Sequence, residues 1–159
     1  MATAAEPLPL NSDLTEGMTL SVSKTIRAPR SRVYAAWTDP AILREWFGPE
    51  SMTCGNAEVD LRVGGRYRIE MAAIDGSRNS VASGEYTQVV PDQKLQFTWH
   101  GCWNPDEISL VTVMFRDSAT PSATDVTILH ERIATTDSAR GFEQGWTGCL
   151  NKLEARFGR

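Results

Sequence analysis

The feature that most constrains this chain is a two-residue alternation of apolar and polar side chains, which recurs in one segment after another over residues 57–133. In one of these segments Leu95, Phe97 and Trp99 fall on one side, and polar residues lie between them. This period is typical of a strand that buries one of its two faces. Because turn-forming residues such as Gly64-Gly65 separate the segments, neighbouring strands are expected to pair as antiparallel hairpins.

About seven strands are predicted. A first strand is expected over residues 18–27, where the alternation is regular and β-branched residues are frequent. Six more strands are expected to follow one another without an intervening helix, at residues 57–61, 66–71, 84–90, 94–100, 108–117 and 124–133. Strands that follow one another in this way favour one antiparallel sheet.

Two short helices are predicted between the first strand and the others. Trp37 and Trp46 each follow an apolar residue by four positions, so each helix presents one tryptophan on its apolar face. Asp39-Pro40 separates the two helices, with the aspartate as N-cap and the proline in the first turn. Gly48 and the proline after it end the second helix.

A long amphipathic helix of about 20 residues is predicted within the C-terminal segment 137–158, where apolar residues recur every three or four positions. Gly141, Gly145 and Gly148 share a face at the edge of the apolar stripe. Each glycine costs about 1 kcal/mol relative to alanine inside a helix. The three glycines therefore indicate either the close approach of a neighbouring element or space left beside the helix.

Length and charge narrow the classes of protein to be considered. The chain has 159 residues and a formal net charge of −4, without a basic run, so neither nucleic acid nor a membrane surface is expected as a partner. Residues 18–159 are expected to form a single domain and residues 1–17 a flexible tail that is not a secretory signal. The three cysteines are scattered and odd in number, which favours reduced thiols in a cytoplasmic protein.

Several segments together carry a family resemblance: APRSRVYAAWTDPAILREWFGP (28–49), VGGRYRIEM (63–71), GEYTQVVPDQKLQFTW (84–99), TDVTILHE (124–131), and a Gly-Trp pair followed by Leu150 and Leu153. In this order they resemble the SRPBCC superfamily, which includes START domains, ring cyclases and the birch-pollen allergen. More narrowly, the chain resembles the subfamily named for the activator of 90-kDa heat shock protein ATPase homologue.

The resemblance implies an α+β helix-grip fold, in which a curved antiparallel sheet of about six to seven strands wraps around a long C-terminal helix. It also implies a deep apolar cavity between the sheet and that helix. It does not imply one activity, because the same fold hosts carriers, cyclases and co-chaperone modules.

The sequence offers few residues for catalysis. His130 shares a strand face with apolar residues, so it is expected either to point into the cavity or to be satisfied by hydrogen bonds in the core. His100 and Cys102 are too few ligands for a zinc site, and no phosphate-binding loop is present. No catalytic residue, metal or cofactor is therefore predicted.

We interpret the sequence as that of a protein that binds a small hydrophobic or aromatic molecule in this cavity. Two alternatives stay open: a cyclase- or lyase-type enzyme that uses His130 or Tyr67 for proton transfer, and a chaperone-associated interaction module with a role in the stress response. A homodimer also stays open. The residues expected to line the cavity are Trp37, Trp46, Tyr67, Ile69, Met71, Phe97, Trp99, Val111, Val113, His130, Phe142 and Trp146.

Overall fold

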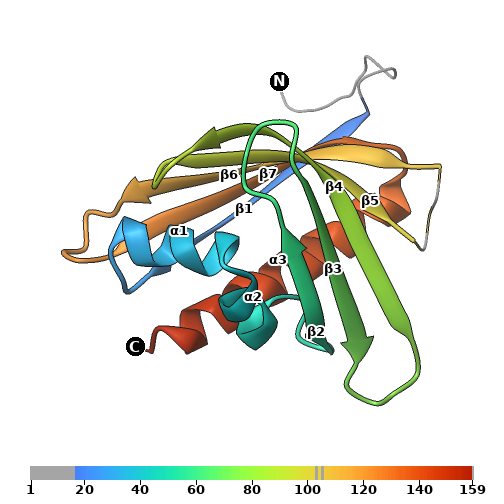
Figure 1. Ribbon diagram of the computed structural model, residues 1–159, viewed down its shortest axis with the longest axis horizontal. Coiled ribbons are helices and arrows are strands. Elements are labelled where there is room, and N and C mark those ends of the chain that lie inside the picture. Colours follow the sequence, from blue (N-terminus) through green and yellow to red (C-terminus); the bar gives the residue numbers. More distant parts are fainter. Residues whose placement is uncertain (1–16, 103, 105, 159) are drawn as a thin grey trace.

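A computed structural model of the chain describes residues 17–102, 104 and 106–158 (Figure 1). The tail expected at residues 1–17 lies outside these described residues, apart from Gly17. Strand β1 (Met18–Ile26) leads into helices α1 (Arg30–Thr38) and α2 (Pro40–Trp46). The remaining elements are β2 (Met52–Val59), β3 (Arg66–Ala73), β4 (Asn79–Val90), β5 (Lys94–Gly101), β6 (Ile108–Asp117), β7 (Thr124–Ile133) and α3 (Thr136–Arg156).

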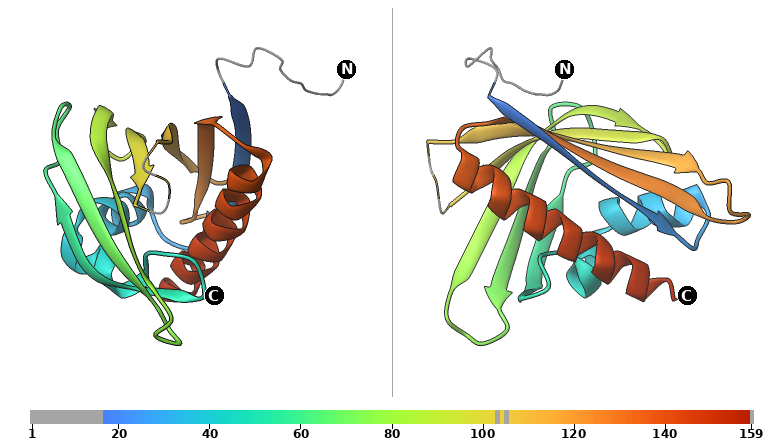
Figure 2. Two further views of the ribbon diagram at one scale, coloured as in Figure 1. Left: turned by 90° about the vertical axis from the view of Figure 1, so that its right-hand side faces the viewer. Right: turned by 180° about the vertical axis from the view of Figure 1, so that it is seen from behind.

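The strands form one seven-stranded sheet in the order β1-β7-β6-β5-β4-β3-β2. Every neighbouring pair is antiparallel, and β1 closes one edge by pairing with β7. The sheet curves around α3, which lies along its concave side (Figure 2). The predicted α+β helix-grip fold, with two short helices after the first strand, is therefore confirmed.

The alternation in the sequence explains which side of the sheet is buried. On β5, Leu95, Phe97 and Trp99 are 1%, 5% and 6% exposed, and the residues between them are more accessible. On β3, Tyr67 and Ile69 follow the same pattern. These side chains face α1, α2 and α3, so the core of the protein lies on the concave side of the sheet.

Three predicted strand boundaries are wrong. Strand β2 begins at Met52 and not at Ala57. Leu61 was expected on a strand, but β2 ends at Val59 and Leu61 is exposed in the six-residue loop 60–65. Strand β4 begins at Asn79 and not at Gly84. Apart from Val81, its first half has polar or small side chains that carry little strand propensity, although they alternate between the two faces.

Helices α1 and α2 meet at the predicted sharp corner. Asp39 caps α2, because its Oδ1 accepts a hydrogen bond from the backbone N–H of Ala41 at 2.9 Å. The indole Nε1 of Trp46 donates to the carbonyl of Ala36 at 2.9 Å, which ties the second helix to the first. The rings of Trp37 and Trp46 meet edge to face, with 5.1 Å between centroids. The corner is thereby fixed against the core.

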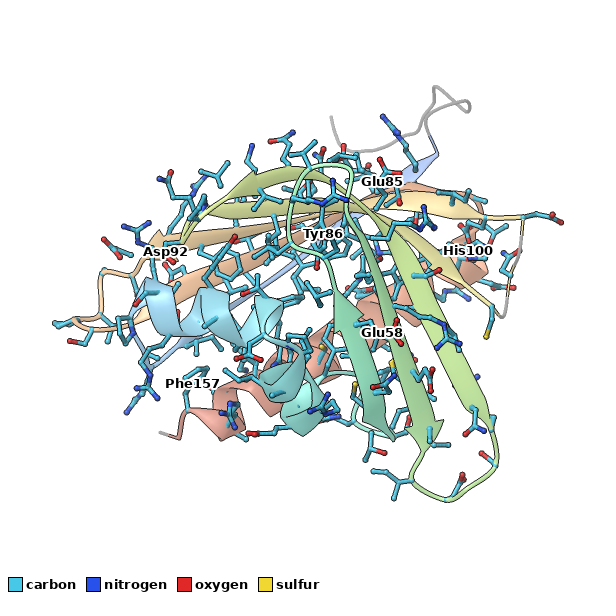
Figure 3. All side chains as sticks on the ribbon, viewed as in Figure 1. Glu58, Glu85, Tyr86, Asp92, His100 and Phe157 are labelled. Carbon is cyan, nitrogen blue, oxygen red and sulfur yellow. The ribbon has the colours of Figure 1, made fainter. Side chains whose placement is uncertain are left out.

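Both ends of α3 are anchored. At its start, the buried carboxylate of Glu107 accepts hydrogen bonds from the backbone N–H of Ala134 and the hydroxyl of Ser138, at 2.6 and 2.9 Å. At its end, the ring of Phe157 lies near the guanidinium groups of Arg32 and Arg156, 5.2 and 5.9 Å from their central carbons (Figure 3). The helix is thus fixed across the open side of the sheet.

Candidate ligand-binding site

A cavity of about 380 Å³ lies between α3, the segment that joins α2 to β2, and strands β3–β5. Figure 2 shows α3 and strands β2–β4 on opposite sides of the concave space. The volume falls in the range of about 300–1,000 Å³ that is typical of small-molecule sites. Its inner wall consists of buried apolar side chains: Phe47, Met52, Met71, Trp99, Trp146 and Cys149.

The glycines of α3 shape the cavity in two different ways. A Cβ added at Gly141 would meet no described atom within 4 Å, and one at Gly145 would lie 3.7 Å from Cγ of Pro49. Both glycines line the cavity. At Gly148, in contrast, a Cβ would lie 3.0 Å from the backbone nitrogen of Glu50. The first two glycines leave room beside the helix, and the third permits the close approach of a neighbouring segment.

That neighbouring segment, residues 47–52, is held against α3 by Lys152. The Nζ of Lys152 donates to the carbonyl oxygens of Met52, Pro49 and Phe47, at 2.8, 3.3 and 3.5 Å. Partial burial lowers the pKa of this ammonium group. Gly48, with φ at +112°, makes the turn that brings these carbonyls together. The wall of the cavity and the helix therefore form one connected unit.

Behind the inner wall, His130 is completely buried on β7 and connects the sheet to α3. Its Nδ1 accepts a hydrogen bond from the indole Nε1 of Trp146 at 2.9 Å, and its Nε2 lies 2.6 Å from Oγ of Ser109. Because an indole N–H can only donate, Nδ1 is unprotonated and Nε2 carries the proton that is donated to Ser109. The hydrogen-bond network thus sets the tautomer of the imidazole.

His130 also orients a second cavity residue. The ring of Phe142 stacks on the imidazole, with 4.2 Å between centroids and 26° between the planes. Burial lowers the pKa of His130 to about 3, so the imidazole is neutral near pH 7. Phe142 and Trp146 both line the cavity. His130 therefore positions two aromatic rings of the site without facing the cavity itself.

The outer part of the cavity is polar. Arg78 and Asp137 are exposed, and they lie just before β4 and in the first turn of α3, respectively. Ser80 and Ser138 lie deeper, and the Ser138 hydroxyl donates to Glu107. The site thus has an apolar interior and a mouth with one charge of each sign.

Residues 27–158 match the model of a protein family described as "Activator of Hsp90 ATPase homolog 1-like protein". The chain belongs to this family. Its members share the helix-grip fold predicted above, and the fold typically binds hydrophobic ligands. No curated protein matches the chain.

Solved structures of related proteins share the fold. CV1439 from Chromobacterium violaceum is 27% identical, with 89% of this chain and 99% of that chain covered and a TM-score of 0.74. The AHSA1-like protein from Aeromonas hydrophila is 27% identical, with coverage of 87% and 90% and a TM-score of 0.71. The AHSA1 protein SPO3351 from Silicibacter pomeroyi is 25% identical, with coverage of 87% and 96% and a TM-score of 0.73.

In this member of the family, four of the twelve residues expected to line the cavity do so: Met71, Trp99, Phe142 and Trp146. Contact between these four and a ligand stays a prediction. The other eight are buried in the core and do not line this cavity: Trp37, Trp46, Tyr67, Ile69, Phe97, Val111, Val113 and His130. Several of them surround only a void of about 20 Å³, because their rings pack against one another.

The two residues considered for proton transfer are both engaged in hydrogen bonds. The hydroxyl of Tyr67 donates to the carbonyl of Thr98 at 2.6 Å, and burial raises the pKa of this phenol well above its usual value. Both nitrogens of His130 have partners, as described above. Neither residue lines the cavity, so the structure brings no pair of these groups together inside it.

Residues 17–102, 104 and 106–158 contain no group of three or more His, Cys, Asp or Glu side chains arranged to hold a metal ion. Cys54, Cys102 and Cys149 are free thiols, and burial raises the pKa of Cys149. Over the same residues, no helix is long and apolar enough to span a membrane.

Sequence reasoning missed most of the polar mouth and the wall formed by residues 47–52. Arg78 and Ser80 precede residues 84–90, which the sequence predicts as a strand, so the alternation assigns neither residue to a face. One signal could have located the cavity. Gly141 and Gly145, one helical turn apart at the edge of the apolar stripe, mark the part of α3 that borders empty space.

Proposed function

We propose that the protein binds a small apolar or aromatic molecule in the cavity between α3 and the sheet. The observation that carries this proposal is an open volume of about 380 Å³ walled by Trp99, Phe142 and Trp146 in a core that is otherwise closely packed. Fixed aromatic walls with few polar groups favour flat apolar ligands. Binding of such a ligand would place the protein among the carriers or sensors of this fold.

The proposal can be tested with N-phenyl-1-naphthylamine, a neutral probe whose fluorescence rises in apolar surroundings. The wild-type protein should bind it with a stoichiometry near one. Gly141→Leu should weaken binding at least tenfold, because the new side chain starts from a position that borders the cavity. Gln144→Leu adds the same side chain to an exposed position of the same helix that does not line the cavity, and should leave the affinity unchanged.

Absence of probe binding in the wild type, or equal binding by the two variants, would refute a ligand site in this cavity. Native mass spectrometry of freshly purified protein would show directly whether a small molecule copurifies.

The family description favours a second candidate function, contact with a heat shock chaperone. Its test is the rate of ATP hydrolysis by the 90-kDa chaperone with and without this protein. A concentration-dependent increase is expected if the contact exists, and an unchanged rate at saturating protein would exclude activation. The Gly141→Leu variant distinguishes the two candidates, because a protein contact does not require an open cavity.

A further inference from the structure

Ser80 is a polar residue at an unexpected depth. It lies on β4, is 6% exposed and lines the cavity among apolar side chains. Within residues 17–102, 104 and 106–158, its hydroxyl has no hydrogen-bond partner. A hydroxyl that borders a cavity can donate to or accept from a molecule that enters it. The position therefore suits a ligand that supplies a hydrogen-bonding atom.

Arg78 points to the kind of atom that is needed. It lies two residues before Ser80, just ahead of β4, and both residues line the cavity. Over the described residues Arg78 forms no ion pair within 4 Å. Asp75 lies within electrostatic range, but its carboxylate is hydrogen-bonded to Ser77. A guanidinium group and a hydroxyl that line one cavity can both donate to a carboxylate.

Asp137 limits the charge that the mouth can accept. It is exposed in the first turn of α3 and lines the same cavity from the other side of the concave space. Its carboxylate has no hydrogen bond among the described residues and would repel a second negative charge. The neighbouring Ser138 hydroxyl is already engaged with Glu107. Of the two serine hydroxyls in the lining, the one without a partner among the described residues thus lies on the Arg78 side.

We propose that the ligand is an aromatic or apolar molecule with a single carboxylate, which Ser80 and Arg78 receive at the mouth while the apolar body lies against Trp99 and Trp146. This inference rests on the proposed function and specifies the chemical class of its ligand. The aromatic walls supply most of the affinity, and Ser80 and Arg78 supply the selection for an acidic end group.

Three compounds that share one ring system separate these contributions: 2-naphthoate, 2-naphthylmethanol and 2-naphthylmethylammonium. Each is used to displace N-phenyl-1-naphthylamine from the full-length protein. The carboxylate should bind at least about fivefold more tightly than the alcohol, and the ammonium compound should bind no better than the alcohol. Because Arg78 is exposed, this preference should shrink in 1 M NaCl.

Single substitutions test which residues cause the preference for the carboxylate. Arg78→Met should abolish the preference for the carboxylate over the alcohol. Ser80→Ala should lower the affinity for 2-naphthoate, and Asp137→Asn should raise it. Arg62→Met removes an exposed arginine from the β2–β3 loop, outside the cavity lining, and should change none of the three affinities.

Different results would refute the acidic ligand and the apolar site. If the probe binds and all three compounds displace it equally, the acidic ligand is refuted and the apolar site stands. If the preference survives Arg78→Met, the assignment of the carboxylate to Arg78 is wrong. If neither the probe nor any of the three compounds binds, the proposed function itself is wrong.

Discussion

Replacement of Trp146 tests whether the hydrogen bond to His130 stabilises the wall of the cavity. The indole is 4% exposed, and its Nε1 donates to Nδ1 of His130. Trp146→Phe keeps an aromatic ring and removes the donor, which leaves a completely buried acceptor unsatisfied. Such a loss costs about 1–3 kcal/mol, so the free energy of unfolding should fall by that amount.

Trp146→Ala should cost more, because packing is lost as well. A tryptophan surrounded on all sides typically loses about 3–5 kcal/mol on truncation to alanine. One side of this indole borders the cavity, and the other side packs on Trp99 with 5.1 Å between ring centroids. The packing loss should therefore be nearer the transfer value of about 2–3 kcal/mol. With the unsatisfied imidazole included, the expected total is about 3–6 kcal/mol.

The assay is urea unfolding at pH 7, followed by far-ultraviolet circular dichroism so that the loss of a tryptophan does not alter the signal. Trp37→Phe is the matched control: Trp37 is equally buried, and its Nε1 has no hydrogen-bond partner in the described part of the chain. It should cost less than Trp146→Phe. If the two phenylalanine variants were equally stable, the Trp146–His130 hydrogen bond would contribute nothing, and the positioning role of His130 would be wrong.

Two further predictions concern acid and the third glycine of α3. Because the pKa of His130 is about 3 in the folded protein and about 6.5 in an unfolded chain, the unfolded state binds an extra proton between these values. The free energy of unfolding should therefore fall on acidification below about pH 6.5, by up to about 1.4 kcal/mol per pH unit. In His130→Gln the urea midpoint should depend less on pH between pH 7 and 5. The same pH dependence in the variant and the wild type would contradict the buried neutral imidazole. Gly148→Ala should lower the free energy of unfolding by about 1 kcal/mol through its clash with Glu50, whereas Gly141→Ala, which meets no described atom, should raise it by up to about 1 kcal/mol. Equal effects of the two alanines in thermal unfolding would show that the approach of Glu50 is unimportant.

Periodicity in the sequence was sufficient to predict the faces of the strands. Leu95, Phe97 and Trp99 were expected on one side of a strand and are all buried on the concave side. Alternation is a property of the backbone, so it can be read without knowledge of the partner strands. The first half of β4, from Asn79, could not be predicted because most of its residues have weak strand propensity. For the same reason the cavity residue Ser80 was not predicted.

Periodicity could not predict which of the buried residues border the cavity. Phe97 and Trp99 have the same character and lie on the same face of one strand, yet Trp99 lines the cavity of about 380 Å³ whereas Phe97 borders only the small void. Which aromatic residue borders open space depends on where the facing helix has no side chain. In this protein that is determined by Gly141 and Gly145, two positions without a side chain, and by the path of residues 47–52.

The pairing of β1 with β7 has a consequence for the order in which the chain can fold. Thr25 lies opposite Asp125, a hundred residues later, and their side chains are hydrogen-bonded. Contacts between such distant residues form slowly, because a long loop must close first. During synthesis from the N-terminus, β1 leaves the ribosome long before its partner strand exists. The helix that closes the concave side is made later still, so the cavity is the last part of the molecule to be enclosed.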